Sequence, residues 1–177
     1  NDQLANGFHY TVGFNLSDYQ SEVTKFDNES KELGNWYVGQ KQGEIWGYET
    51  YGLFQSEQEI AGAANQDKVS GGIKLMPGDI RFVDRNNDGV IDWGDNTVDN
   101  PGDKKIIGNS TPRYHYGINL GADWKGFDLG IFFQGVGKRD LYLPGTSFRS
   151  HYGSEWQVPS AYNNDYWTEE NTGAYFP

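Results

Sequence analysis

The sequence predicts an all-β protein, and three observations lead to this fold class. Residues 8–16, 114–124 and 127–137 each alternate apolar and polar side chains with the two-residue period of a strand. Aromatic residues make up 16% of the chain and 24 of its 177 residues are glycine, a composition typical of strands joined by turns. Few segments have a helical pattern, so we expect strands with long connections.

The first strand is expected at residues 8–16, with an apolar face and a polar face. The apolar face comprises Phe8, Tyr10, Val12, Phe14 and Leu16, and the polar face comprises His9, Thr11, Gly13 and Asn15. Residues 17–44 are polar and are expected to form a loop, in which residues 22–26 could extend the strand.

The next elements are expected to be short. Residues 45–54 have the composition of a strand, and Ser56 with Glu59 forms a capping box that predicts a helix over residues 57–63. Residues 64–77 are expected to be a loop, and residues 78–83 a strand.

The segment DRNNDGVIDWGD at residues 84–95 has the spacing of an EF-hand-type calcium loop. Oxygen-bearing side chains fall at positions 1, 3, 5, 9 and 12, while positions 6 and 7 provide a sharp turn and a backbone carbonyl. The predicted ligands are therefore Asp84, Asn86, Asp88, Val90, Asp92 and Asp95, with Gly89 at the turn. Calcium is favoured over magnesium because such a loop suits the larger ion.

Two features limit the calcium interpretation. Position 12 is Asp95 in place of the longer glutamate that normally binds through both oxygens, and the preceding residues 78–83 read as a strand. We therefore expect a calcium-stapled loop in a β protein, not a helix–loop–helix pair. The alternative is a solvated acidic turn, because Asp, Asn and Gly are common turn residues.

Residues 114–124 and 127–137 are expected to form a hairpin with a tight turn at residues 125–126. The first strand directs Tyr114, Tyr116, Ile118, Leu120, Ala122 and Trp124 to one face. The second does the same with Phe127, Leu129, Ile131 and Phe133, whereas Phe132 is an exception on the polar face.

This pattern predicts part of an antiparallel transmembrane β-barrel, in which alternate side chains face lipid and lumen. The short turn would be periplasmic, and the long segments at residues 17–113 and 138–177 would be extracellular loops, one of them carrying the calcium site. The alternative is a soluble, calcium-stabilised β-sandwich that binds glycans. A barrel would expose Ile118, Leu120, Leu129 and Ile131 to lipid, whereas a sandwich would bury them.

The composition of the chain excludes several classes of partner and site. The net charge of −11 argues against nucleic acid and anionic lipid as partners, and the absence of cysteine excludes disulfides and thiolate metal sites. No catalytic residues are expected: His9, His115 and His151 are far apart in sequence, and the clustered acids suit metal binding better than acid–base catalysis. The chain starts at Asn1 and ends at Pro177, so we expect a piece of a longer protein.

Aromatic side chains with polar tips crowd the last segment, at Trp156, Tyr162, Tyr166, Trp167 and Tyr175. Such residues suit protein interfaces and sugar stacking, and we expect packing within the loop or contact with a partner ahead of direct contact with a substrate.

The sequence resembles the C-terminal half of SusC/RagA-type TonB-linked outer-membrane transporters. The resemblance rests mainly on PGDIRFVDRNNDGVIDWGD (residues 77–95) and KKIIGNSTPRYHYGINLGADWKGFDLGIFFQGVGKRDLY (residues 104–142), with further similarity at residues 15–26, 47–60 and 161–177. The matching residues include Gly78, Asp79, Ile80, Gly108, Asn109, Pro112, Tyr116, Gly117, Asn119, Lys125, Gly126, Phe127, Asp128, Leu129, Phe132, Gln134 and Gly135.

This resemblance implies a barrel of about 22 strands with an N-terminal plug, of which the chain would be one part. It also implies an outer-membrane location in a Gram-negative bacterium, with loops facing the exterior. The implied partners are a SusD-like surface lipoprotein, the rest of the transporter including its plug, the TonB complex, outer-membrane lipid, and an oligosaccharide or peptide substrate.

Overall fold

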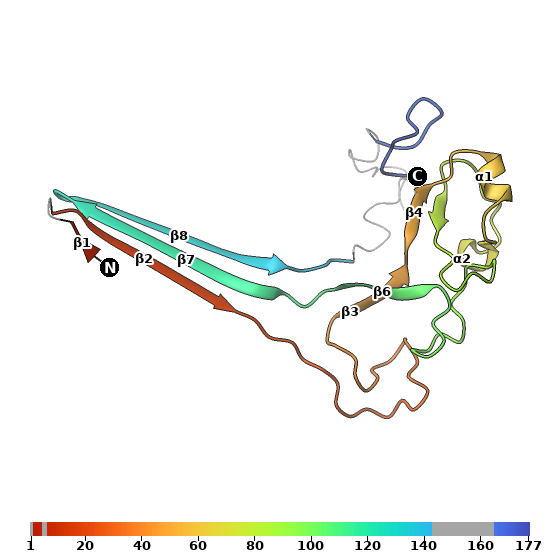
Figure 1. Ribbon diagram of the computed structural model, residues 1–177, viewed down its shortest axis with the longest axis horizontal. Helices are drawn as coiled ribbons and strands as arrows, with labels where there is room; N and C mark the ends of the chain where they lie inside the picture. Colours follow the sequence, from red (N-terminus) through yellow and green to blue (C-terminus); the bar gives the residue numbers. More distant parts are fainter. Residues whose placement is uncertain (1, 5–6, 143–164) are drawn as a thin grey trace, which may run out of the picture.

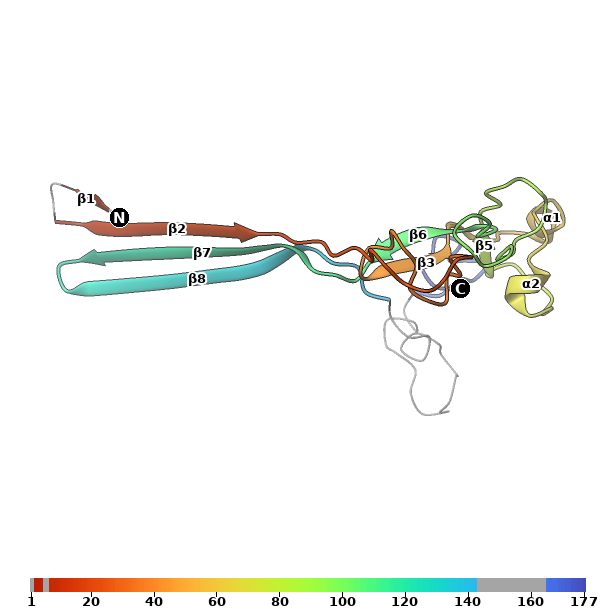
Figure 2. The same cartoon turned by 90° about the horizontal axis from the view of Figure 1, so that it is seen from below.

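The computed structural model describes residues 2–4, 7–142 and 165–177. The chain is elongated: long strands extend from one end, and shorter strands and two small helices gather at the other (Figures 1 and 2). The elements are mostly strands, in agreement with the predicted all-β class.

A four-stranded antiparallel sheet forms the long end of the molecule, in the order β1-β2-β7-β8. Its strands are β1 (Asp2–Gln3), β2 (His9–Ser17), β7 (Arg113–Trp124) and β8 (Phe127–Lys138). The three long strands begin and end within one residue of the predicted ranges, and only the two-residue β1 was not predicted.

The register of the sheet aligns the apolar side chains across β2, β7 and β8. Val12 lies opposite Leu120, which lies opposite Ile131, and the next apolar row is Phe14, Ile118 and Phe133. Because side chains alternate between the faces of a strand, this register collects the apolar residues on one face. Lys125 and Gly126 join β7 to β8 with φ of 48° and 85°, as a two-residue type I′ turn requires.

The apolar face of this sheet remains exposed. Phe14 is 66% exposed and Phe133 is 53% exposed, although both lie in the middle of long strands. Figure 2 shows the sheet as a single layer, with no described helix or strand lying over either face.

The residues between β2 and β7 fold into a unit that we call the insert unit, residues 18–112. It contains two pairs of antiparallel strands, β3 (Glu44–Tyr48) with β6 (Lys104–Asn109) and β4 (Thr50–Leu53) with β5 (Ile80–Phe82). Its helices are α1 (Glu57–Ala61) and α2 (Asp67–Ser70). The fully buried Phe54 and Ile91 and the nearly buried Tyr37 form its small core.

Several predictions for the insert unit need correction. The single strand expected at 45–54 is two strands, and residues 22–26 contribute only an isolated bridge between Glu22 and Lys41. Residues 64–77 were expected to be a loop but include α2, and β6 was not predicted at all. The predicted capping box is confirmed at Ser56, whose hydroxyl accepts a hydrogen bond from the Glu59 N–H at 3.2 Å, although the helix ends two residues early.

Neither of the two helices in the described residues has the length or the apolar run that a helical membrane crossing requires.

Candidate functional site: the acidic loop of the insert unit

The acidic loop spans residues 84–95, and Gly89 forms the tight turn in its first half. This glycine has φ of 82°, which side-chain-bearing residues rarely adopt, and its N–H donates to Asp84 Oδ2 at 2.9 Å. Asp88 N–H donates to Asn86 Oδ1 at 3.0 Å, and Val90 N–H donates to Asp88 Oδ1 at 2.8 Å. These bonds direct the side chains at positions 1, 3 and 5 back over the turn.

A second segment of the insert unit pairs with the middle of the loop. Asn65 N–H donates to the Gly89 carbonyl at 2.8 Å, and Ile91 N–H donates to the Asn65 carbonyl at 2.7 Å. Ile91, at position 8, is fully buried and anchors the loop in the core. The Val90 carbonyl, predicted as the position-7 ligand, takes no part in this pairing.

The side chains at positions 9 and 12 are held by other donors. Asp92 Oδ2 lies 2.6 Å from the ammonium of Lys68, and Asp95 Oδ2 accepts from Asn100 Nδ2 at 2.9 Å. The hydrogen bond from Lys68 is the main cause of a lowered Asp92 pKa, and Asp92 in turn raises the pKa of Lys68. Lys68 was not among the predicted site residues, because no local pattern links it to Asp92.

A buried carboxylate outside the motif spans the two halves of the loop. Asp103 is fully buried; its Oδ1 accepts from Arg85 N–H and its Oδ2 from Asp92 N–H, both at 2.8 Å. No local sequence pattern indicates this role, because Asp103 follows the loop by eight residues.

One observation favours a hard cation at the predicted ligands of the acidic loop. Asp84 Oδ1 is buried and has no hydrogen-bond partner, which is costly for a carboxylate oxygen unless a cation or a donor compensates it. All predicted ligands are oxygens, the donors that calcium prefers. In the described part of the chain, however, no three acidic or histidine side chains are already gathered around one centre.

Only some of the predicted contact residues are described. Trp156 and Tyr162 lie outside the described residues, as does His151. Tyr166 is exposed and forms a bridge with Phe176, whereas Trp167 packs against Gly78 and donates from Nε1 to Gln55 Oε1 at 3.0 Å. Trp167 thus ties the last described segment to the insert unit.

The two described histidines do not come together. His9 lies opposite Asp123 near the hairpin turn, and His115 lies opposite Ser17 at the other end of the same strands. They are therefore separate polar-face residues.

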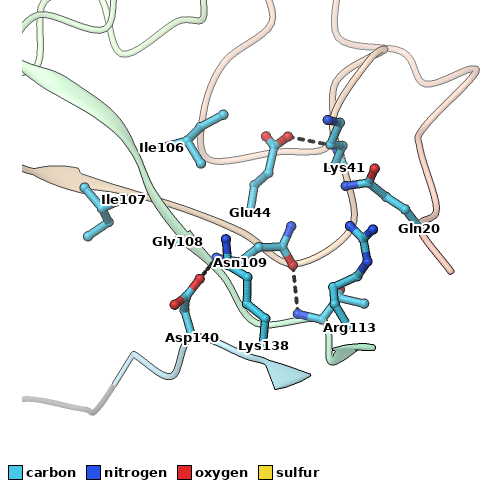
Figure 3. A pocket seen from close by; sticks show the side chains of 11 residues that line it. Gln20, Lys41, Glu44, Ile106, Ile107, Gly108, Asn109, Arg113, Lys138 and Asp140 are labelled. Carbon is cyan, nitrogen blue, oxygen red and sulfur yellow. Dashed lines mark hydrogen bonds between the residues drawn. The ribbon is translucent and has the colours of Figure 1, made fainter. Parts of the chain in front are cut away.

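A pocket of about 420 Å³ lies where the insert unit meets the long sheet, and Figure 3 shows its lining. Glu44 Oε1 accepts from Lys41 N–H at 2.9 Å, and Asp140 Oδ2 accepts from Asn109 N–H at 2.7 Å. Both carboxylates are thus occupied by backbone N–H groups. We therefore interpret the pocket as part of the structural contact between the insert unit and the long sheet.

The described residues thus form a β protein with an uncovered apolar sheet face and an acidic loop that contains a buried, unpartnered carboxylate oxygen. No family model matches the chain. It is similar to TonB-dependent receptor P39 of Formosa agariphila, with 27% identity over 184 residues, which covers 86% of this chain and 17% of that protein. It is also similar to TonB-dependent receptor P3 of the same organism, with 33% identity over 96 residues, covering 54% of this chain and 8% of that protein.

These similarities relate the chain to TonB-dependent receptors. The matched region spans less than a fifth of the length of either relative.

Proposed function

We propose that this chain is part of a TonB-dependent outer-membrane transporter, with β2, β7 and β8 contributing to the barrel. The observation that carries the proposal is the apolar sheet face, which is aligned in register and left uncovered. The opposite face is mainly polar residues and glycine, with Phe132 and Val136 as exceptions. Strands of this length and alternation suit a bilayer, where apolar side chains contact lipid and backbone groups are paired between strands. The similarity to TonB-dependent receptors supports the same conclusion.

The alternative is the soluble glycan-binding sandwich. A sandwich would bury the apolar face against a second sheet, about 10 Å away. No described element occupies that place, so the barrel is the better proposal.

The test is the electrophoretic mobility of the full-length protein from the outer-membrane fraction, with and without boiling. A closed barrel resists detergent until it is heated, so we expect a mobility shift and a membrane-bound protein. A water-soluble protein without a heat shift would refute the transporter proposal and favour the sandwich.

Within this function, we propose the SusC/RagA type, which imports an oligosaccharide or peptide with a SusD-like lipoprotein and is energised through TonB. The sequence motifs support this type. Residues 165–177 lie beside the insert unit (Figure 1) and include the exposed aromatic residues Tyr166 and Tyr175. Co-purification of a surface lipoprotein with the tagged full-length protein from its native outer membrane would support the proposal. A transporter that is purified alone under mild detergent conditions would contradict it.

We further propose that the acidic loop binds calcium and serves stability. The unpartnered Asp84 Oδ1 supports this proposal, because a divalent cation would supply the missing partner and offset the repulsion among four aspartates. Calcium should slow cleavage of residues 70–110 by added protease, and chelator should accelerate it. Cleavage that is insensitive to both would contradict the proposal.

A further inference from the structure

We propose that Asp103 is a positioning residue for the calcium loop and that its buried charge is compensated by the bound cation. This inference rests on the proposed calcium site. It adds a residue that lies outside the twelve-residue motif.

The first argument is connectivity. Asp103 Oδ1 binds the N–H of Arg85, at loop position 2, and Oδ2 binds the N–H of Asp92, at position 9. One carboxylate therefore sets the spacing between the start of the loop, next to Asp84, and its second half. Outer-shell groups that orient ligands in this way strongly influence metal affinity.

The second argument is charge. Asp103 is fully buried, and none of the ion pairs in the described residues involves it. The side chains of Arg85, and of Lys104 and Lys105 that follow Asp103 in sequence, have other partners; Lys105 pairs with Glu49. The Arg85 guanidinium donates to the Lys104 carbonyl at 3.3 Å, and the Lys104 ammonium donates to Asn96 Oδ1 at 2.8 Å. A buried carboxylate that has only backbone donors is stabilised by a nearby cation.

The third argument is close packing of the segment that carries Asp103. Gly102 has φ of 59°, and a Cβ built there would lie 2.5 Å from the Asp92 carbonyl oxygen and 2.5 Å from the Gly94 nitrogen. The backbone at residue 102 therefore lies directly against the second half of the loop. This contact leaves little freedom for the Asp103 carboxylate to move away from its two N–H partners.

The experiment is a calcium titration of protease protection over residues 70–110 in the full-length protein, comparing wild type with Asp103→Asn. The amide keeps the shape but removes the charge and one acceptor. We expect the calcium concentration at half-protection to rise by about 10- to 100-fold, the range for loss of an outer-shell partner. The matched control is Asp99→Asn, which removes an exposed charge from the same segment and should shift the midpoint by less than about twofold.

A second readout separates positioning from a merely structural role. In calcium, Asp103→Asn should accelerate cleavage strongly, because the variant lacks a charge that the cation compensates. In chelator it should accelerate cleavage only weakly, because the wild-type protein then carries a costly uncompensated charge that the variant lacks. Equal acceleration in both conditions with an unchanged midpoint would overturn the inference. If Asp103→Asn does not accumulate, Asp103→Glu, which keeps the charge on a longer arm, should raise the midpoint, and an unchanged midpoint would again overturn it.

The outcomes also separate the two proposals. If calcium does not change the protease protection of the wild-type protein, both the calcium site and this inference are refuted. A wild-type response that Asp103→Asn leaves unchanged would refute the role of Asp103 alone.

Discussion

Replacing Leu120 by arginine tests whether the apolar sheet face contacts lipid. Leu120 lies in the central long strand, with Val12 and Ile131 directly opposite it on either side. It is four residues from Trp124, the last residue of β7 before the turn. At about 3.4 Å per residue this is about 14 Å along the strand, or about 10 Å along the membrane normal for a strand tilted by about 40°.

This depth places Leu120 near the middle of an apolar band about 25 Å tall, if Trp124 marks one boundary. The expected cost of Leu120→Arg is then about 2–4 kcal/mol of unfolding free energy, whereas arginine at the interface costs about 0–1 kcal/mol. Phe127→Arg, at the turn, is the matched interfacial control. Asn119→Arg, on the polar face of the same strand, should also be tolerated.

The assay is denaturant unfolding of the full-length protein in lipid vesicles. The folded fraction is monitored by the shift in electrophoretic mobility on heating. The reasoning would be refuted by equal losses for Leu120→Arg and Phe127→Arg, because the cost of arginine on a lipid-facing strand depends on its depth in the bilayer. It would also be refuted if Asn119→Arg were as costly as Leu120→Arg, since the two faces of the strand would then be equivalent.

Four further predictions concern the insert unit and the last segment. Gly89→Ala should destabilise the acidic loop by about 1–2 kcal/mol because alanine resists its positive φ, so protease should cleave residues 70–110 faster; wild-type protection would contradict this. Lys68→Met should lower the calcium concentration at half-protection, because the ammonium no longer competes for Asp92; a higher or unchanged midpoint would contradict it. Trp167→Ala should accelerate hydrogen exchange over residues 165–177, since the indole bond to the insert unit is lost, and unchanged exchange would argue against this anchor. Burial, with help from Glu44, raises the pKa of Tyr37 to about 12, above the unfolded value of about 10. Stability should therefore fall as pH rises from about 10 to 12, and Tyr37→Phe should reduce this loss in thermal melts; identical pH profiles would refute it.

The long strands could be predicted from the sequence because each has one apolar face along its whole length. A period of two residues over nine or more positions leaves little choice of structure or register. The missed β6 lacks this signal: its adjacent Ile106 and Ile107 are both about half exposed, so neither face is marked. Its pairing with β3, about 60 residues earlier, decides its conformation.

The acidic loop was predicted in its local geometry but not in its surroundings. Gly89 adopts the positive φ that the motif requires, because the turn is encoded by neighbouring residues. Lys68, Asn65 and Asp103 contact the loop from positions outside it, and no spacing rule identifies them. Helix α2 was missed for a related reason, since it has four residues and no side-chain cap.

The pairing of Ser17 with His115 has a consequence for the architecture as a whole. Paired residues on neighbouring strands have Cα atoms only about 5 Å apart, so the insert unit leaves the sheet and returns to it at almost the same point. The ion pair between Asp18 and Arg113 holds these two ends together. The insert unit is therefore a cassette in topological terms: a short turn could replace residues 19–112 without changing the register of β2 and β7. Insertions or substitutions confined to this cassette would therefore leave the strands that carry it unchanged.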